Sequence, residues 1–148
     1  LLKHGARKVY AIDTGRGRLD LALREDPRVV TLEGTNVLSL AGLPQKIDLV
    51  TIDVSLTSLR VVLPAVRQWL RPEGAVVALF KPQYEVRDMS LLKHGIVADP
   101  RVRESLLQEF RLWLAANGWR ERGFMESPIR GSEGNVEFLF YLHAHDAH

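Results

Sequence analysis

Three charged residues, two at the ends of apolar segments and one within an apolar segment, are of types that could act on a substrate hydroxyl. Asp53 follows the mostly apolar stretch 49–52, and Lys81 follows 75–80 and precedes Pro82. Proline lacks a backbone donor and restricts the residue before it, so Lys81 is predicted at the rim of a sheet. Glu137 lies in the apolar segment 135–144. A buried acid needs a cation, and Lys81 is the natural partner. Taken alone, Lys81 is better explained as a solvated lysine, and a structural salt bridge would explain Glu137 equally well.

A third carboxylate, Asp13, ends the segment 8–13 and is followed by Gly15 and a second glycine. This spacing imitates a dinucleotide-binding fingerprint, with Glu33 near the position of a ribose-binding acid. Asp20 occupies the place of the third glycine, where a carboxylate would face a pyrophosphate. We therefore prefer Asp13 itself as a ribose ligand, because one carboxylate can accept hydrogen bonds from both ribose hydroxyls. A simple turn residue is the alternative.

The elements that must position these residues alternate along the chain. We predict strands over 8–13, 28–33, 48–55, 75–80, 119–127 and 135–144, helices over 17–26, 56–74 and 99–118, and a loop over 85–98. Asp99 should cap the last helix, and Ser55 could cap the one before it. The strand over 48–55 is apolar on both faces and is therefore predicted to be buried.

This order predicts an α/β fold with a mostly parallel sheet and an antiparallel strand pair at its end. The pattern is typical of class I methyltransferases, which have a Rossmann-like sheet with an inserted antiparallel last strand. Neither a repeat nor a linker interrupts the chain, so residues 1–148 are predicted to form one domain.

Composition excludes several classes of protein. The apolar content of 46% and charged content of 26% argue against disorder. No apolar run approaches the length of a membrane span, so no membrane partner is expected. The absence of cysteine excludes a thiol nucleophile and a cysteine metal site, and it fits a cytoplasmic protein. The histidine-rich end, 143–148, is assigned no metal or other function. A net charge of +2 permits a nucleic-acid partner.

The stretches "VYAIDTGRGRLD", "IDLVTIDVSLTSL", "FKPQYE" and "GNVEFLFYL", with "GIVADP" between the last two, occur in this order. In this run of motifs the chain resembles the haemolysin A-type (TlyA) proteins, which belong with the FtsJ-like RNA 2′-O-methyltransferases. The resemblance implies S-adenosyl-L-methionine (SAM) as methyl donor and ribosomal RNA or a ribosomal subunit as substrate. It also implies a Lys-Asp-Lys-Glu catalytic set, in which Asp53, Lys81 and Glu137 match the last three members.

The resemblance further implies which residues bind the cofactor. Asp13 matches the acid that binds the ribose of SAM, and Asn36 with Val37 matches the position that contacts adenine. Asp53 is expected at the cofactor as well. Leu56 stands where phenylalanine is common, and residues 91–97 replace a glycine-rich stretch in a presumed substrate loop.

The start of the chain suggests a fragment. Residues 1–5 resemble the last turn of a helix that ends at Gly5, and no initiator methionine precedes them. The glycine-rich SAM loop, the first catalytic lysine and the small RNA-binding domain of the family are expected before residue 1, so the chain alone is expected to be inactive. The family's first strand lies between those ending at Asp13 and Asp53. Its absence predicts a gap in the sheet, closed by repacking or by association with another chain, such as a homo-oligomer.

Two questions remain open at the level of sequence. Lys81 could accept the proton of the ribose hydroxyl, or it could be an electrostatic anchor paired with Asp53 and Glu137. The protein could also be a non-catalytic methyltransferase-like scaffold, or a haemolysin-type protein that binds RNA or a partner, although a scaffold has no need of three such residues. A nicotinamide-dependent enzyme is disfavoured by Asp20.

Overall fold

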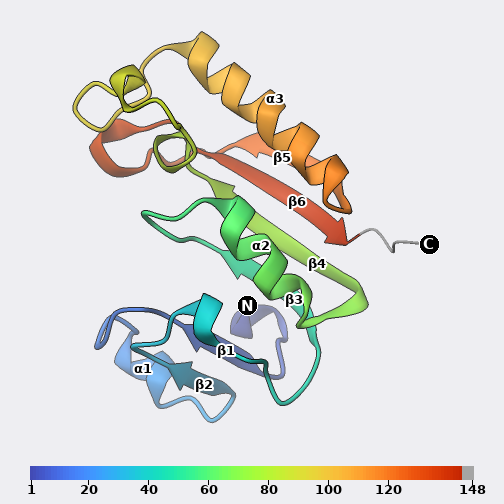
Figure 1. Cartoon of the computed structure of the whole chain (residues 1–148). Helices are drawn as coiled ribbons and strands as arrows, with labels where there is room; N and C mark the ends of the chain where they lie inside the picture. The colour runs from blue at the N-terminus through green and yellow to red at the C-terminus, as the bar shows by residue number, and fades with distance from the viewer. Residues whose placement is uncertain (145–148) are drawn as a thin grey trace. The chain divides into compact units, whose positions relative to one another are not determined.

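The computed structural model describes residues 1–144, which form two compact units (Figure 1). The first unit is Leu1–Leu43, and the second begins at Pro44. That residues 1–148 form one domain stays a prediction.

The first unit contains a two-stranded parallel sheet. β1 (Val9–Ile12) pairs with β2 (Val29–Leu32), and α1 (Leu21–Arg24) connects them. Two short 3-10 helices, η1 (Leu2–His4) and η2 (Val37–Ser39), flank the sheet. Asp20 is the N-cap of α1, because its Oδ1 accepts a hydrogen bond from the Ala22 amide at 2.8 Å. This capping role explains an acid at the third position of the glycine motif.

The second unit is built on a four-stranded sheet in the order β3-β4-β6-β5. β3 (Ile47–Ile52) runs parallel to β4 (Leu70–Phe80). β6 (Phe138–Ala144) is antiparallel to both of its neighbours, β4 and β5 (Trp119–Glu126). The last strand is therefore inserted next to β4, and the predicted antiparallel insertion is confirmed.

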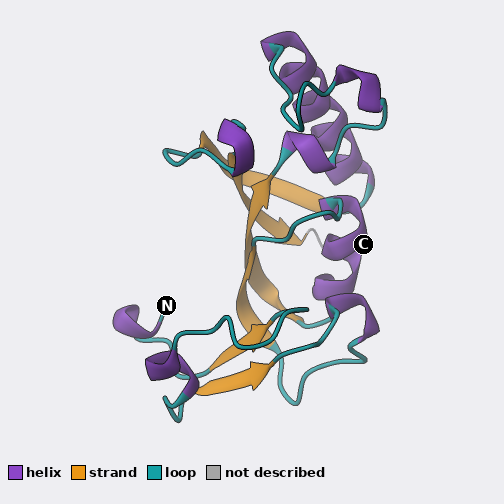
Figure 2. Cartoon of the chain, turned by 90° about the vertical axis from the view of Figure 1, so that its left-hand side faces the viewer, coloured by secondary structure: helices purple, strands orange, loops and turns teal. Residues whose placement is uncertain are grey.

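Two helices, α2 (Leu59–Arg67) and α3 (Pro100–Ala116), cover one face of this sheet (Figure 2). Phe80, Phe110 and Phe140 meet beneath α3 and are fully buried, with ring centroids 4.9 Å apart for Phe80–Phe110 and 5.1 Å for Phe110–Phe140. Burying such rings is the main favourable contribution to folding. Asp99 caps α3 as predicted, by accepting from the Arg101 amide at 2.9 Å.

The helix predicted over 56–74 is shorter than expected. It begins after Ser58, whose side chain caps it, and not after Ser55. At its other end the Ile47 amide donates to the Trp69 carbonyl, and Leu70 pairs with Ile47, so residues 70–74 join β4. Pairing between strands has overridden the helical spacing of apolar residues there.

The strand predicted to be buried on both faces is largely exposed. Of the residues in β3 only Ile52 is buried, and Leu49 is 40% exposed. Within residues 1–144, β3 has a hydrogen-bonded neighbour only in β4, and β1 only in β2. One edge of each of these strands therefore has no strand partner among the described residues.

Three short 3-10 turns complete the second unit. η3 (Pro82–Tyr84) follows β4 directly, η4 (Met89–Leu91) lies in the loop predicted over 85–98, and η5 (Ser132–Gly134) precedes β6. A bridge between Lys93 and Ile96 is the one β-pair in that loop among the described residues. The loop prediction is confirmed, and the turns place polar side chains at the carboxyl end of β4.

Candidate active site

Lys81 and Asp53 form an ion pair at the carboxyl ends of two neighbouring strands. Because Ile52 pairs with Ala78 in the parallel ladder, the residues that follow β3 and β4 emerge at the same rim. Lys81 Nζ lies 2.6 Å from Asp53 Oδ1 and 3.5 Å from Ser55 Oγ. The Lys81 side chain is 13% exposed, whereas that of Asp53 is 70% exposed. The Asp53 carboxylate of this pair is therefore accessible to solvent, whereas the Lys81 ammonium is mostly covered.

Glu137 reaches the same rim from the antiparallel strand. Phe80 pairs with Phe138, so Lys81 and Glu137 are the next residues beyond that ladder. Glu137 precedes β6 and does not lie within it. It is 4% exposed and accepts a hydrogen bond from Gln83 Nε2 at 2.8 Å. The described residues show no ion pair between Lys81 and Glu137, so the direct pairing expected from sequence is not observed.

Gly131 is required by the position of the Glu137 carboxylate. A Cβ atom built on Gly131 would overlap the carboxylate oxygens of Glu137. The backbone of residue 131 therefore covers this acid closely, and only glycine leaves the necessary space. This explains how a carboxylate just before a strand can be buried against backbone and an amide side chain.

Sequence reasoning missed Gln83 and Glu85, which share the turn with Lys81. Glu85 is 6% exposed, and its carboxylate accepts from Ser58 Oγ at 2.6 Å and from the Leu59 amide at 2.7 Å. Burial raises the pKa of Glu85, while the bonds from Ser58 and Leu59 and the charge of Arg60 oppose the rise. Polar residues at alternate positions 81, 83 and 85 were a signal that could have identified both.

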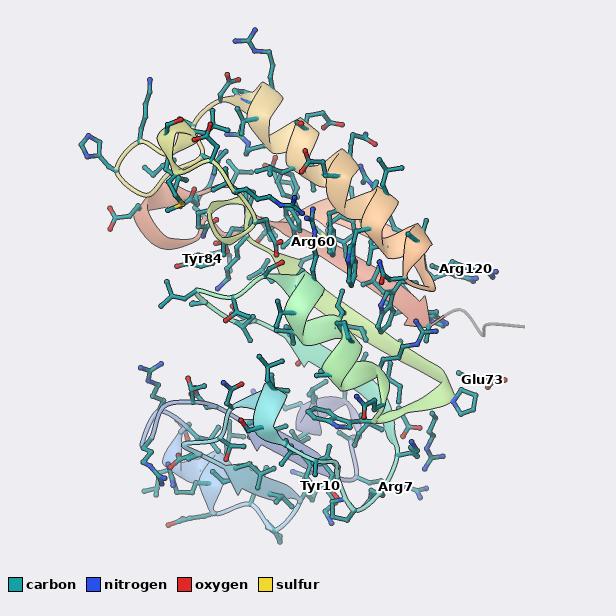
Figure 3. The ribbon with its side chains drawn as sticks, in the orientation of Figure 1. Arg7, Tyr10, Arg60, Glu73, Tyr84 and Arg120 are labelled. Carbon is teal, nitrogen blue, oxygen red and sulfur yellow. The ribbon has the colours of Figure 1, made fainter. Side chains whose placement is uncertain are left out.

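Figure 3 shows how two labelled residues lie around this turn. Tyr84 belongs to η3, and its ring centroid is 6.0 Å from Lys81 Nζ. Arg60 lies in the first turn of α2, and its Nε is buried without a hydrogen-bond partner among the described residues. The cationic side chain of Arg60 thus belongs to the start of α2, and the aromatic ring of Tyr84 lies beside Lys81.

Asn135 connects the loop before α3 to the segment that carries Glu137. It is 1% exposed, its Oδ1 accepts from the Val97 amide at 3.1 Å, and its Nδ2 donates to the Gly95 carbonyl at 2.9 Å. The Gly131 amide donates to the Asn135 carbonyl at 2.8 Å. Residues 95–97, in the presumed substrate loop, are therefore tied to the strand entry that bears Glu137.

The first unit holds Asp13, Asn36 and Val37, three of the four residues expected at the cofactor, and Asp53 belongs to the second unit. Asp13 follows β1, and its Oδ1 accepts from the Gly15 amide at 3.0 Å. The Thr35 amide donates to the Asp13 carbonyl at 2.9 Å, so Asn36 lies on the loop bonded to Asp13. Asn36 Oδ1 caps η2 by accepting from Leu38, and Val37 is half-buried. Asp13 thus forms the turn that was the alternative interpretation, and one of its two oxygens is engaged in it.

Glu33 has a structural role in this unit. It forms an ion pair with Arg24, and this bond and the Gly17 amide hold the pKa of Glu33 below its usual range although partial burial opposes them. Glu33 needs no nucleotide to explain its position, which weakens the dinucleotide interpretation further.

Among residues 1–144 no group of three or more histidine, cysteine or acidic side chains could hold a metal ion. In the same range, none of the helices has the length and apolar character needed to cross a membrane.

Comparison with known proteins identifies the family. The profile of the FtsJ-like methyltransferase family matches residues 1–144. The chain is 42% identical to "Putative rRNA methyltransferase YqxC" of Bacillus subtilis, over 96% of this chain and 52% of that protein. It is 39% identical to 16S/23S rRNA (cytidine-2′-O)-methyltransferase TlyA of Mycobacterium tuberculosis, over 96% of this chain and 54% of that protein. The chain belongs to the FtsJ-like methyltransferase family.

Solved structures support the fold. A structure titled "Putative hemolysin from Streptococcus thermophilus" superposes with a TM-score of 0.93 at 36% identity, over 99% of this chain and 54% of that one. A SAM-dependent methyltransferase from Methanosarcina mazei, at 15% identity, gives a TM-score of 0.64 over 98% of this chain and 86% of that one, and shows the fold alone. The fold is the mixed α/β, Rossmann-like fold of methyltransferases, as predicted. The chain spans about half the length of the curated relatives named here.

Proposed function

We propose that the protein transfers a methyl group from SAM to a ribose 2′-hydroxyl of ribosomal RNA. The observation that carries this proposal is the Lys81–Asp53 pair at the carboxyl ends of β3 and β4, in a chain of the FtsJ-like family. The name of the Mycobacterium tuberculosis relative specifies 2′-O-methylation of cytidine in 16S and 23S rRNA. A substrate of this kind would place the protein in the cytoplasm, with ribosomal RNA or a ribosomal subunit as its partner.

The first unit has groups that fit the adenosine part of SAM. Asp13 is half-buried at the end of a parallel strand, and the Gly15 amide engages only its Oδ1. The other carboxylate oxygen suits the hydroxyls of a ribose. Asn36 and Val37, on the loop that follows β2, would contact adenine. SAM would supply the methyl group, and these residues would hold its nucleoside.

The ion pair supports an anchoring role for Lys81. Lys81 Nζ lies 2.6 Å from Asp53 Oδ1, and an ammonium in this ion pair has further N–H donors for a substrate oxygen. Lys81 would therefore hold the hydroxyl oxygen in line for attack. Asp53 orients Lys81 through Oδ1, and its second oxygen would receive the hydroxyl proton. A carboxylate is a sufficient acceptor because the hydroxyl becomes strongly acidic as its oxygen is methylated.

Glu137 would act through its neighbours. Since its carboxylate is 4% exposed and bonded to Gln83, it holds the turn that follows Lys81 and does not meet the substrate freely. We assign it the role of fixing the path of the chain between Lys81 and β6. The loop over residues 95–97, held by Asn135, would contact the RNA.

The test measures transfer of a radioactive methyl group from SAM to unmethylated 16S and 23S rRNA by the full-length protein. Lys81→Met should lower kcat by about 100-fold or more, because the hydrogen-bond donor that holds the hydroxyl oxygen in line is lost. Lys81→Arg keeps the charge and should retain more activity than Lys81→Met. Lys46→Met, at an exposed lysine bonded to the Gln68 carbonyl, is the matched control and should be unchanged.

The pH profile separates the two roles of Lys81. A lysine that must be neutral would make the rate rise about tenfold per pH unit between about pH 6 and pH 9. An anchor predicts no such rise over this range. Equal loss of activity in Lys81→Arg and Lys81→Met, together with a tenfold slope, would refute the anchor. Binding of rRNA without any methyl transfer by the wild type would favour the scaffold alternative.

A further inference from the structure

The turn after β4 sends three polar side chains to three different parts of the second unit. Lys81 pairs with Asp53 after β3, Gln83 donates to Glu137 before β6, and Glu85 accepts from the start of α2. Pro82 is buried and opens the 3-10 turn η3, whose backbone bonds run from Tyr84 and Glu85 back to residues 81 and 82. This tight turn makes the five residues a single rigid connector.

Glu85 bonds to the first turn of α2 with both carboxylate oxygens. Its Oε2 accepts from Ser58 Oγ at 2.6 Å, and its Oε1 accepts from the Leu59 amide at 2.7 Å. Ser58 Oγ in turn accepts from the Arg60 amide at 3.1 Å. The carboxylate thus satisfies helix donors that the side-chain cap alone leaves unpaired. Charge-assisted bonds of this kind are shorter and stronger than neutral ones.

The helix start that Glu85 holds is also the end of the loop that carries Asp53. This loop leaves β3 after Ile52 and enters α2 at Ser58. Between these points it packs weakly, because Leu56 is 85% exposed and adopts a positive φ of 63°. A non-glycine residue in this conformation is strained, so the two anchored ends must hold the loop in place.

These contacts therefore form a closed series that begins and ends at Lys81. It runs from Lys81 through its ion pair to Asp53, along the loop to Ser58, across to Glu85, and back through η3 to Lys81. Glu85 does not touch the exposed side of the ion pair. Its contacts can affect the pair only through the position of the loop.

We propose that Glu85 is a positioning residue, which holds the loop 53–58 so that Asp53 stays in register with Lys81 during methyl transfer. This inference rests on the function proposed above and gives a role to Glu85, the last residue of the motif "FKPQYE", to which the sequence analysis assigned none. A carboxylate suits the role because it accepts from the Ser58 hydroxyl and the Leu59 amide at once. Glutamine offers a single acceptor oxygen and requires the Ser58 hydroxyl to reverse its direction.

The first experiment compares Glu85→Ala and Glu85→Gln with the wild type in the full-length protein, on unmethylated 16S and 23S rRNA. Glu85→Ala should lower kcat by about 10- to 100-fold, because a displacement of about 1 Å can cost that much. The KM for rRNA should stay within about twofold, since Glu85 makes no contact with substrate. Glu85→Gln should recover part of the lost kcat.

Two controls separate positioning from general stability. Leu114→Ala removes a core side chain that is 2% exposed, and it should destabilise the protein without changing kcat well below its unfolding temperature. Ser58→Ala should lower kcat less than Glu85→Ala, and the loss in the double variant should be smaller than the two single losses combined, because the bond between these side chains is absent from either single variant. Unchanged kcat in Glu85→Ala, or fully additive losses with Ser58→Ala, would overturn the proposal.

A second readout keeps the positioning role testable if the proposed function is wrong. Hydrogen exchange of the amides of residues 53–59 should be at least about tenfold faster in Glu85→Ala than in the wild type, with exchange in β6 unchanged. A wild type that methylates no rRNA would refute the proposed function, while faster exchange in this loop would still support the role of Glu85. Unchanged exchange in the loop would refute that role.

Discussion

The ion pair between Lys81 and Asp53 is unevenly exposed, and this predicts an uneven response to removing either partner. Lys81 is 13% exposed, and its remaining neighbours are Ser55 Oγ at 3.5 Å and the ring of Tyr84. Asp53 is 70% exposed and would be well hydrated without Lys81. We therefore expect Asp53→Ala to destabilise the folded protein more than Lys81→Met.

The exposures set the expected magnitudes. Removing one partner of a fully buried pair costs about 3–5 kcal/mol, and an exposed pair contributes about 0–1 kcal/mol. Asp53→Ala leaves a mostly covered ammonium without its partner, so we expect a loss of about 1–2 kcal/mol, between these limits. Lys81→Met keeps an apolar stem in the same space and leaves Asp53 in water, so we expect less than about 0.5 kcal/mol.

The measurement is urea denaturation of the full-length variants, followed by fluorescence and extrapolated to water. Asp48→Ala is the matched control, since the Asp48–Arg71 pair is exposed on both sides, at 80% and 57%. It should change the free energy of unfolding by less than about 0.5 kcal/mol. A Lys81→Met variant as unstable as Asp53→Ala, or less stable, would refute the reasoning from exposure.

Three further predictions concern the core, the surroundings of Glu137 and the titration of Glu85. Phe110→Ala should lower the free energy of unfolding by about 3–5 kcal/mol, because Phe110 is fully buried. Leu112→Ala should lower it by less than about 0.5 kcal/mol, because Leu112 is 73% exposed. Similar losses for the two variants in urea denaturation would contradict the packing of α3. Gly131→Ala should displace Glu137 and lower methyl transfer more than about tenfold, because the added Cβ overlaps the carboxylate; wild-type kcat in this variant would count against the close packing. The pKa of Glu85 is raised in the folded protein by burial, so its protonated form stabilises the fold below the unfolded-state pKa, and this stabilisation is lost as pH rises through the folded-state pKa. As pH rises from about 4.5, the wild type should therefore lose more stability than Glu85→Gln; equal losses in urea denaturation of the two proteins would contradict the shift.

Several features of the fold could be predicted from sequence because they depend on local chemistry. Asp99 and Pro100 begin α3, and Gly118, with a φ of 77°, follows its end, as their types require. The alternation of strands and helices also predicted the parallel pair β3–β4 and the inserted β6. The helix over 56–74 was predicted too long, because the pairing of Leu70 with Ile47 is a tertiary contact that periodicity does not contain.

The candidate site, like the fold, could be predicted from the sequence only in part. The positions of Asp53 and Lys81 at the ends of adjacent strands follow from apolar patterning and from Pro82, and the structure brings the two side chains together. Glu137 was expected within the last strand and paired with Lys81, but it precedes β6 and its hydrogen-bond partner is Gln83. The role of Glu85 could not be predicted, since its partners lie more than twenty residues away, at the start of α2.

By itself the sequence determined the fold class, the order of the elements and the strand ends that carry Asp53 and Lys81. Strand ends are local events, governed by proline, by glycine and by the alternation of apolar residues. Only the tertiary structure decided which charges pair, because hydrogen-bond partners depend on distances of a few tenths of an ångström between separate elements. It also decided that β3 is exposed, because burial depends on what packs beside a strand and not on the apolar character of the strand alone.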